Sequence, residues 1–155
     1  MSEQSEQLAT FAASTELVGD TRVSVSARDF ELTIDEPEDL GGTNQGPNPV
    51  EFVLGALGGC LSIVGHTVAD EMQLEIEHLE VDLEGDLNPA KFMGADTDAR
   101  AGYQEIRADI DVELHTADGN VADAATVDQW LETVESRCPV SDNLGAATPI
   151  AISQR

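Results

Sequence analysis

The sequence predicts an α+β fold that forms one domain, and three observations support this. Apolar and polar residues alternate in several stretches, as in half-buried strands. An uncharged run over 52–69 predicts an apolar helix, and a later apolar stripe predicts an amphipathic one. No repeat or linker divides the 155 residues, so we expect a single domain over 1–155 with a flexible polar start over 1–10.

Two strands are predicted before residue 35. The alternation breaks at Arg28 and Asp29, which separates the first strand from the second. Residues 35–49, with the sequence DEPEDLGGTNQGPNP, predict a loop because glycine and proline interrupt regular structure. The apolar positions of the two strands are Val23, Val25 and Ala27, then Phe30, Leu32 and Ile34.

A long helix is predicted from Pro49 to about Met72. Asn48 suits the N-cap and Pro49 the first helical position. The helix is apolar on nearly all faces, so we expect it inside the fold or between subunits. A membrane span is not expected, because the run is rich in glycine. Acidic residues flank it on both sides, and no lysine or arginine is present there to anchor a membrane helix.

The second half of the chain predicts two strands over 79–83 and 106–114, joined by a long loop over 85–102. A loop of that length is a candidate lid or binding loop. An amphipathic helix is predicted from near Ala124 to Arg137, followed by a helical turn in PVSDNL and an edge strand in PIAIS. The stripe of the helix consists of Val127, Trp130, Leu131 and Val134.

The charge balance is extreme, with 31 acidic against 7 basic residues and a net charge of −24. Nucleic acid and anionic membrane need cationic contacts, so neither is an expected partner. Acids interleaved with aliphatic residues favour a folded protein over a disordered one. Such a surface suits a salt-adapted organism, in which high salt screens self-repulsion. The start MSEQSEQLAT has no features of a secretory signal, which predicts a cytoplasmic protein.

Two cysteines are the candidates for chemistry. Cys60 follows three glycines that indicate a close approach by another backbone, a ligand or a partner, although a buried apolar filler is an alternative role. Cys138 lies before Pro139, where an N-cap position and the neighbouring Arg137 favour a thiolate. Their spacing excludes a CxxC motif. We expect no metal and no cofactor, because a structural zinc site needs about four ligands.

The run DEPEDLGGTNQGPNPVEFVLGALGGC, the later RCPVSDNL and the closing strand resemble the OsmC/Ohr family, in its OsmC-like branch, over roughly 21–153. The resemblance implies antiparallel sheets wrapped around long central helices in an intertwined homodimer. It also implies a cysteine-based peroxidase for organic hydroperoxides without metal or flavin. Cys60 would attack the peroxide, Cys138 would resolve the sulfenic acid to a disulfide, and a dithiol would reduce it.

The sequence departs from this pattern at one position. Family peroxidases commonly carry a glutamate directly after the motif proline, where it holds an arginine that activates the thiolate. Val50 stands there, and Glu51 follows one residue later. Arg28, in preference to Arg22, is the expected activating cation.

The alternative is a family member without peroxidase activity. It would act in other thiol or sulfur chemistry, bind a small apolar ligand, or serve as a non-catalytic stress-induced dimer.

Overall fold

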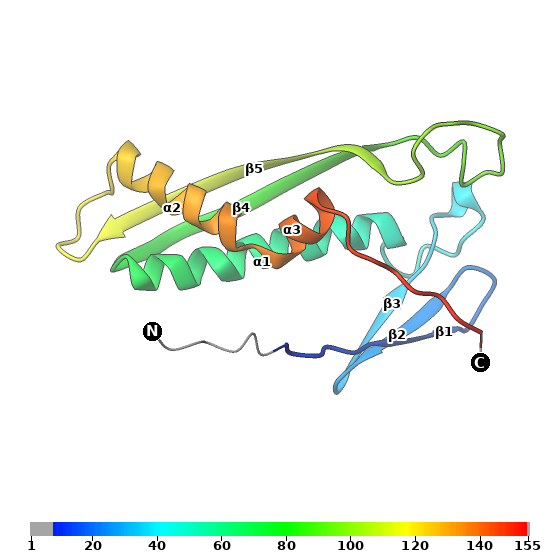
Figure 1. Cartoon of the computed structure of the whole chain (residues 1–155). Helices are drawn as coiled ribbons and strands as arrows, with labels where there is room; N and C mark the ends of the chain where they lie inside the picture. The colour runs from blue at the N-terminus through cyan, green and yellow to red at the C-terminus, as the bar shows by residue number, and fades with distance from the viewer. Residues whose placement is uncertain (1–7, 155) are drawn as a thin grey trace. The chain divides into compact units, whose positions relative to one another are not determined.

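The fold is mixed α+β, with three α-helices and two antiparallel sheets in a computed structural model that describes residues 8–154. The chain divides between Phe52 and Val53 into two compact units, here called the N-terminal and the C-terminal unit. In chain order the elements are β1 (Ser14–Leu17), β2 (Val23–Ala27), β3 (Phe30–Ile34), a 3-10 turn (Glu38–Leu40), α1 (Pro49–Glu71), β4 (Leu74–Leu87), β5 (Tyr103–Thr116), α2 (Ala124–Arg137) and α3 (Pro139–Gly145) (Figure 1).

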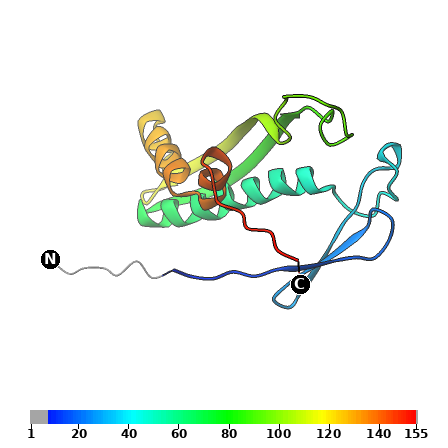
Figure 2. The same ribbon diagram turned by 45° about the vertical axis from the view of Figure 1, so that its right-hand side comes forward.

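The N-terminal unit contains a three-stranded antiparallel sheet in the order β1-β2-β3 (Figure 2). The predicted strands β2 and β3 are confirmed. Ala27 pairs with Phe30, so Arg28 and Asp29 form a two-residue hairpin turn, and Arg28 has a φ of 55°. The sequence analysis did not predict β1, whose four residues are all exposed and show no clear alternation.

Asp35 organises the loop after β3. Its side chain is fully buried and accepts hydrogen bonds from the Thr21 and Thr43 hydroxyls at 2.6 and 2.5 Å. It also accepts backbone N–H groups of Glu36, Thr43 and Gln45. These hydrogen bonds hold its pKa well below the ordinary range, the Thr21 hydroxyl being the largest contributor. The buried carboxylate therefore fixes the glycine-rich loop that leads to α1.

Helix α1 begins where the sequence predicts. The Asn48 Oδ1 accepts the Glu51 backbone N–H at 2.9 Å, and the Glu51 carboxylate accepts the Asn48 N–H at 2.8 Å. This reciprocal pair is a capping box, which satisfies two backbone donors at the helix start.

The C-terminal unit is built on the β4–β5 hairpin. Helices α1, α2 and α3 pack with this hairpin in one core (Figure 1). Both predicted strands are confirmed but each is 14 residues long, so the connecting segment shortens to residues 88–102. Ion pairs around the Arg107 guanidinium add to the strand pairing. Its nitrogens lie 2.6 to 3.4 Å from carboxylate oxygens of Glu84, Asp86 and Glu105.

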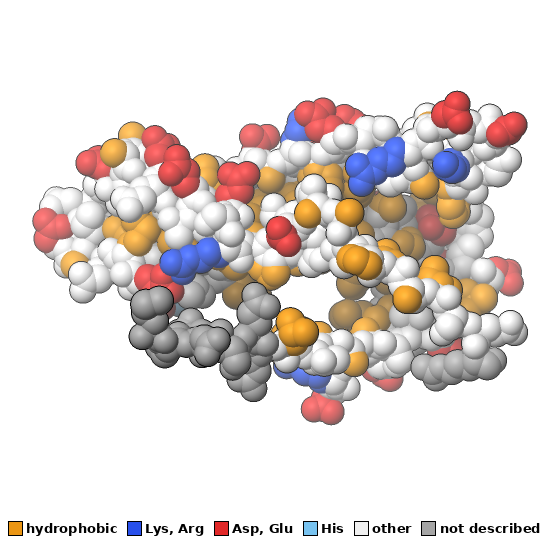
Figure 3. Space-filling model, viewed as in Figure 1, with side chains coloured by type: hydrophobic (Ala, Val, Ile, Leu, Met, Phe, Trp, Pro, Cys, Tyr) orange, Lys and Arg blue, Asp and Glu red, His pale blue; other side chains and the backbone are white. Residues whose placement is uncertain are grey.

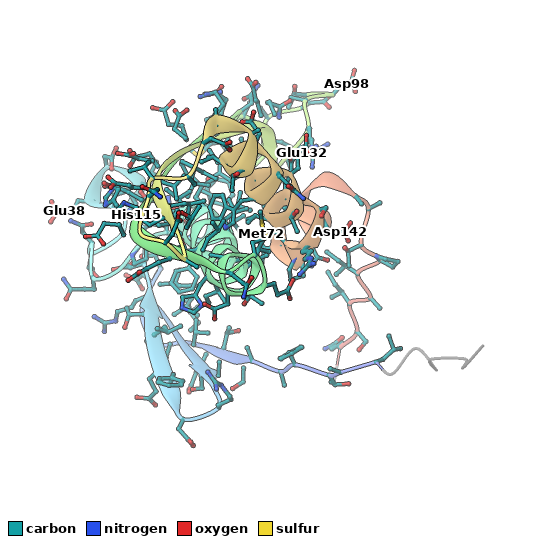
Figure 4. All side chains as sticks on the ribbon, turned by 90° about the vertical axis from the view of Figure 1, so that its left-hand side faces the viewer. Glu38, Met72, Asp98, His115, Glu132 and Asp142 are labelled. Atoms are coloured by element: carbon teal, nitrogen blue, oxygen red, sulfur yellow. The ribbon has the colours of Figure 1, made fainter. Side chains whose placement is uncertain are left out.

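Trp130 joins α2 to α1. Its side chain is 1% exposed, and its indole Nε1 donates to the Gly65 carbonyl at 2.9 Å. Figure 4 looks along this packed region, with Met72 lying among the core side chains and Glu132 and Asp142 directed outward. The core residues from Val53 onward are Leu57, Leu61, Val68, Ala69, Leu74, Leu114, Ala122, Trp130, Val134 and Cys138.

The predicted last strand is wrong. Residues 149–153 form no strand in the described chain, and Ile150 and Ile152 are 84% and 94% exposed. The alternation is present, but a strand also needs a hydrogen-bonded neighbour, and this segment has none in a single chain. The predicted flexible start lies mostly outside the described residues, and residues 8–10 have neither helix nor strand.

Acidic side chains are distributed over the visible face of the molecule in Figure 3, with apolar groups between them. Helix α1 is the one helix of the described chain that is long and apolar enough to cross a membrane. Its residues Leu57, Leu61, Gly65, Val68 and Ala69 are buried within the protein, so α1 is a core helix.

Candidate functional site

The two cysteines come from different elements of the C-terminal unit. Cys60 lies at the middle of α1, where it is partly buried and packs against the core. Cys138 connects α2 to α3 and is 2% exposed. Both are free thiols. The fold therefore brings together two cysteines that are separated by 78 positions in the sequence.

The two thiols are neighbours in the core. The Cys138 side chain interacts with the Cys60 thiol and raises its pKa, and the backbone N–H of Val140 lowers it. A disulfide needs its two sulfurs to approach to about 2.05 Å. Local adjustment can bring neighbouring thiols to that distance, so the arrangement permits a disulfide.

The environment of Cys60 favours the protonated thiol. Burial raises the pKa of the Cys60 thiol, and the interaction with Cys138 raises it further. The Val140 N–H opposes these effects because it stabilises the thiolate. The groups of the C-terminal unit thus leave the Cys60 thiol harder to ionise than that of a free cysteine.

Cys138 caps α3, as the sequence predicts. Its Sγ accepts the Ser141 backbone N–H at 3.4 Å, with Pro139 at the first helical position. The sequence analysis did not identify Val140 as a contact of Cys60. A backbone N–H leaves no trace in residue type, so the only available signal was its place directly after Pro139.

Glu51 acts in the capping box at the start of α1. It lies nine positions before Cys60, so the two residues occupy opposite faces of an ideal helix at about 100° per residue. The described contacts of Glu51 explain why a carboxylate is present at that position without any reference to the thiols.

The two candidate arginines lie in the N-terminal unit. Arg28 lies in the β2–β3 turn, where the alternation of the sequence breaks, and Arg22 lies directly before β2. Both are exposed, and the Arg28 guanidinium lies 5.0 Å from the centre of the Phe30 ring. Activation of Cys60 by Arg28 therefore stays a prediction.

Among residues 8–154, no group of three or more histidine, cysteine or acidic side chains is arranged to hold a metal ion. The histidines contact acids of the surface: His66 lies 3.6 Å from Asp70 and His115 lies 2.8 Å from Glu113. None of these contacts involves a cysteine. The described chemistry at this site is that of the two sulfurs and the amide groups around them.

The protein is thus an α+β protein with two free thiols, one on α1 and one between α2 and α3, in a core built on an antiparallel hairpin. The chain belongs to the OsmC-like protein family, whose sequence model matches residues 42–153. No curated protein matches the sequence.

Solved structures share the fold. An OsmC-like protein from Mycoplasma pneumoniae has a TM-score of 0.73 at 18% identity, covering 90% of this chain and 89% of the other. An organic hydroperoxide resistance protein OsmC from Legionella pneumophila gives 0.59 at 17% identity, covering 90% and 91%. An organic hydroperoxide resistance protein from Elizabethkingia anophelis gives 0.62 at 15% identity, covering 89% of each chain. At these identities the likeness shows the fold alone.

Proposed function

We propose that the protein is a thiol-dependent peroxidase that reduces organic hydroperoxides. The observation that carries the proposal is the proximity of the Cys60 and Cys138 thiols, which come from two elements of one core. Two fold relatives named organic hydroperoxide resistance proteins support this substrate class.

The reaction follows from the roles that the two thiols can take. The Cys60 thiolate attacks one peroxide oxygen, the O–O bond breaks, and the alcohol leaves after taking a proton. Cys138 then attacks the Cys60 sulfenic acid, which releases water and forms the disulfide. Two thiols lose two electrons, and the hydroperoxide gains them. A dithiol reductant restores the pair by thiol–disulfide exchange. The proposed setting is the cytoplasm.

The direct test is hydroperoxide consumption. Purified protein treated with cumene hydroperoxide should lose two thiols per chain and form a Cys60–Cys138 disulfide. Cys60→Ser should lower the rate at least a hundredfold, whereas Cys138→Ser should accumulate a sulfenic acid that dimedone traps. Ser62→Ala is the matched control on the same helix and should retain the wild-type rate. Wild-type protein that keeps its thiols under hydroperoxide would contradict the proposal.

Arg28 is the proposed activating cation, because the C-terminal unit raises the Cys60 pKa and a reactive thiolate needs a positive neighbour. The proposed role of Glu51 is to hold that guanidinium from a partner chain. Arg28→Gln should lower the rate at pH 7 at least tenfold and move the pH–rate midpoint upward, with Arg22→Gln as the matched control. Equal rates in the two variants would show that Arg28 does not activate Cys60.

Glu51→Gln separates capping from catalysis. Glutamine keeps the capping box but loses the charge. A lower rate at unchanged helix stability would support a catalytic role, and an unchanged rate would limit Glu51 to the cap.

A homodimer is the proposed assembly. Gly55, Ala56, Gly59 and Ile63 form an exposed apolar face on α1, here called the open face, and Ile63 is 71% exposed. A Cβ placed on Gly55 or Gly59 meets no atom within 4 Å. A second copy would remove this apolar surface from water.

A non-peroxidase role is the second candidate. The raised pKa of Cys60 and the engagement of Glu51 in a helix cap favour it. A protein that uses the thiol pair in other sulfur chemistry would not reduce hydroperoxides. It would still form the Cys60–Cys138 disulfide when treated with diamide.

A further inference from the structure

Cys138 carries hydrogen bonds for two helices at once. Its backbone N–H donates to the Glu135 carbonyl at the end of α2, and its carbonyl accepts the Asp142 N–H at the start of α3. Its sulfur accepts the Ser141 N–H at 3.4 Å. The same atom that would enter a disulfide is therefore the N-cap of α3.

The first turn of α3 lies beside the two sulfurs. Pro139 has no N–H, the Ser141 N–H hydrogen-bonds the Cys138 sulfur at 3.4 Å, and the Val140 N–H stabilises a Cys60 thiolate. An isolated helix of seven residues is not stable in water, so α3 relies on its caps and on its packing. Val140 and Leu144 are its partly buried residues against the core.

Access to the Cys138 sulfur is also restricted. Cys138 is 2% exposed, whereas Cys60 is partly buried, and thiol–disulfide exchange requires a reductant to approach a sulfur along the S–S axis. A reductant can therefore attack the Cys138 sulfur only after a local opening.

We propose that formation of the Cys60–Cys138 disulfide uncaps α3 and loosens the segment over 139–153, which opens the disulfide to its reductant. The inference rests on the proposed function, since it describes how the same thiol pair is recycled. Oxidation removes two protons and two electrons from the thiols, which pass to the hydroperoxide to give alcohol and water. The sulfurs move into bonding distance, and the Cys138 sulfur leaves the Ser141 N–H. After the reductant takes the disulfide apart, the thiol returns to its capping position.

The test is hydrogen exchange measured by mass spectrometry on the full chain, reduced or oxidised with diamide. Peptides covering 140–146 should exchange at least about fivefold faster after oxidation, the factor that corresponds to a lost N-cap of about 1 kcal/mol. Peptides from α2 over 126–134 should exchange at the same rate in both states. Equal or slower exchange over 140–146, or no Cys60–Cys138 disulfide with diamide, would overturn the inference.

Two variants of Cys138 isolate the cap from the disulfide. Cys138→Ala removes the cap and should give fast exchange over 140–146 without any oxidant. Cys138→Ser supplies a strong N-cap and should keep slow exchange with or without diamide. Equal exchange in the two variants would show that the sulfur does not hold α3. Because diamide replaces the hydroperoxide, failure of the peroxidase proposal would appear separately, as diamide oxidation without hydroperoxide reduction.

Discussion

Gly65 is a residue whose lack of a side chain lets two helices meet. A Cβ at this position would lie 2.8 Å from the Trp130 Cζ2, and the Gly65 carbonyl accepts the indole N–H. The Trp130 ring is buried, so it has little room to move away. The glycine therefore sets how closely α1 and α2 approach.

Gly65→Ala should lower the free energy of unfolding by about 1–3 kcal/mol, the usual cost of overpacking a core. Urea unfolding followed by tryptophan fluorescence measures this. Gly102→Ala is the control, since a Cβ there meets only the flexible Arg100 side chain at 3.7 Å. Equal midpoints for the two variants would mean that Trp130 shifts without cost.

Asp35 makes the stability of the N-terminal unit depend on pH. Its pKa is lowered in the folded state, so the unfolded chain binds its proton at higher pH than the folded chain does. Its stabilising contribution is fully present above the ordinary aspartate pKa of about 3.9 and is lost as pH falls toward the folded value.

The expected result is a pH-dependent difference between wild type and Asp35→Asn. The asparagine variant should be less stable at pH 7. Its difference from wild type in free energy of unfolding should narrow between about pH 5 and pH 3, as the ordinary aspartate pKa is crossed. Urea midpoints across this range measure it. Asp29→Asn, in the exposed hairpin turn, controls for the loss of one charge. A gap that stays constant with pH would contradict the assignment.

Helix α1 has two different faces along its length. Leu57, Leu61 and Val68 lie in the core, whereas the open face is apolar without being covered in the single chain. An exposed apolar stripe of this size on a core helix is typical of an interface.

Ile63→Glu should therefore convert the proposed dimer to a monomer. A charge at the centre of a buried interface is left unpaired, which typically costs several kcal/mol. Size-exclusion chromatography with light scattering gives the mass. Leu131→Glu, on α2 and 37% exposed, is the matched control and should remain dimeric. A monomeric wild type, or a dimeric Ile63→Glu variant, would show that the open face is not a dimer interface.

At the scale of the whole molecule, the net charge of −24 makes the stability of the fold depend on salt concentration. The β4–β5 register places acids directly opposite acids, in the pairs Glu80 with Asp111, Asp82 with Asp109 and Asp86 with Glu105. Directly opposed like charges destabilise a sheet. Arg107 offsets the last pair through its contacts with both of its members.

The melting temperature should rise with salt, because the Debye length falls from about 10 Å at 0.1 M to about 3 Å at 1 M. Asp82→Asn should reduce that salt dependence, since it removes one opposed pair. Asp98→Asn removes the same charge in the loop after β4 and serves as the control. A melting temperature independent of salt would argue against the salt-adapted surface.

Much of the fold was predictable because its signals are local. Asn48 and Pro49 mark the start of α1, the Trp130 stripe marks α2, and period-two alternation marks β2 to β5. Strand lengths were underestimated, since hydrogen bonding between β4 and β5 extends each strand beyond its clear alternation. Residues 149–153 were mispredicted for the related reason that a strand needs a neighbour as well as a pattern.

The candidate site was predictable in part. Cys60, and Cys138 as the cap of α3, follow from motifs and from the neighbouring Pro139. The Asp35 hydrogen bonds and the Val140 contact with Cys60 were not predictable, because they join groups whose spacing carries no periodic signal.

The sequence by itself determined the types of β2 to β5 and of the three helices, the start of α1, the acidic surface and the two cysteines in their motifs. Each of these depends on residues that are neighbours in the chain or recur at a helical or strand period. Only the tertiary structure decided that the two thiols are neighbours, that the Cys138 sulfur caps α3, and that burial raises the Cys60 pKa. Those properties depend on packing between elements far apart in sequence, where distance and solvent exclusion act and local pattern does not.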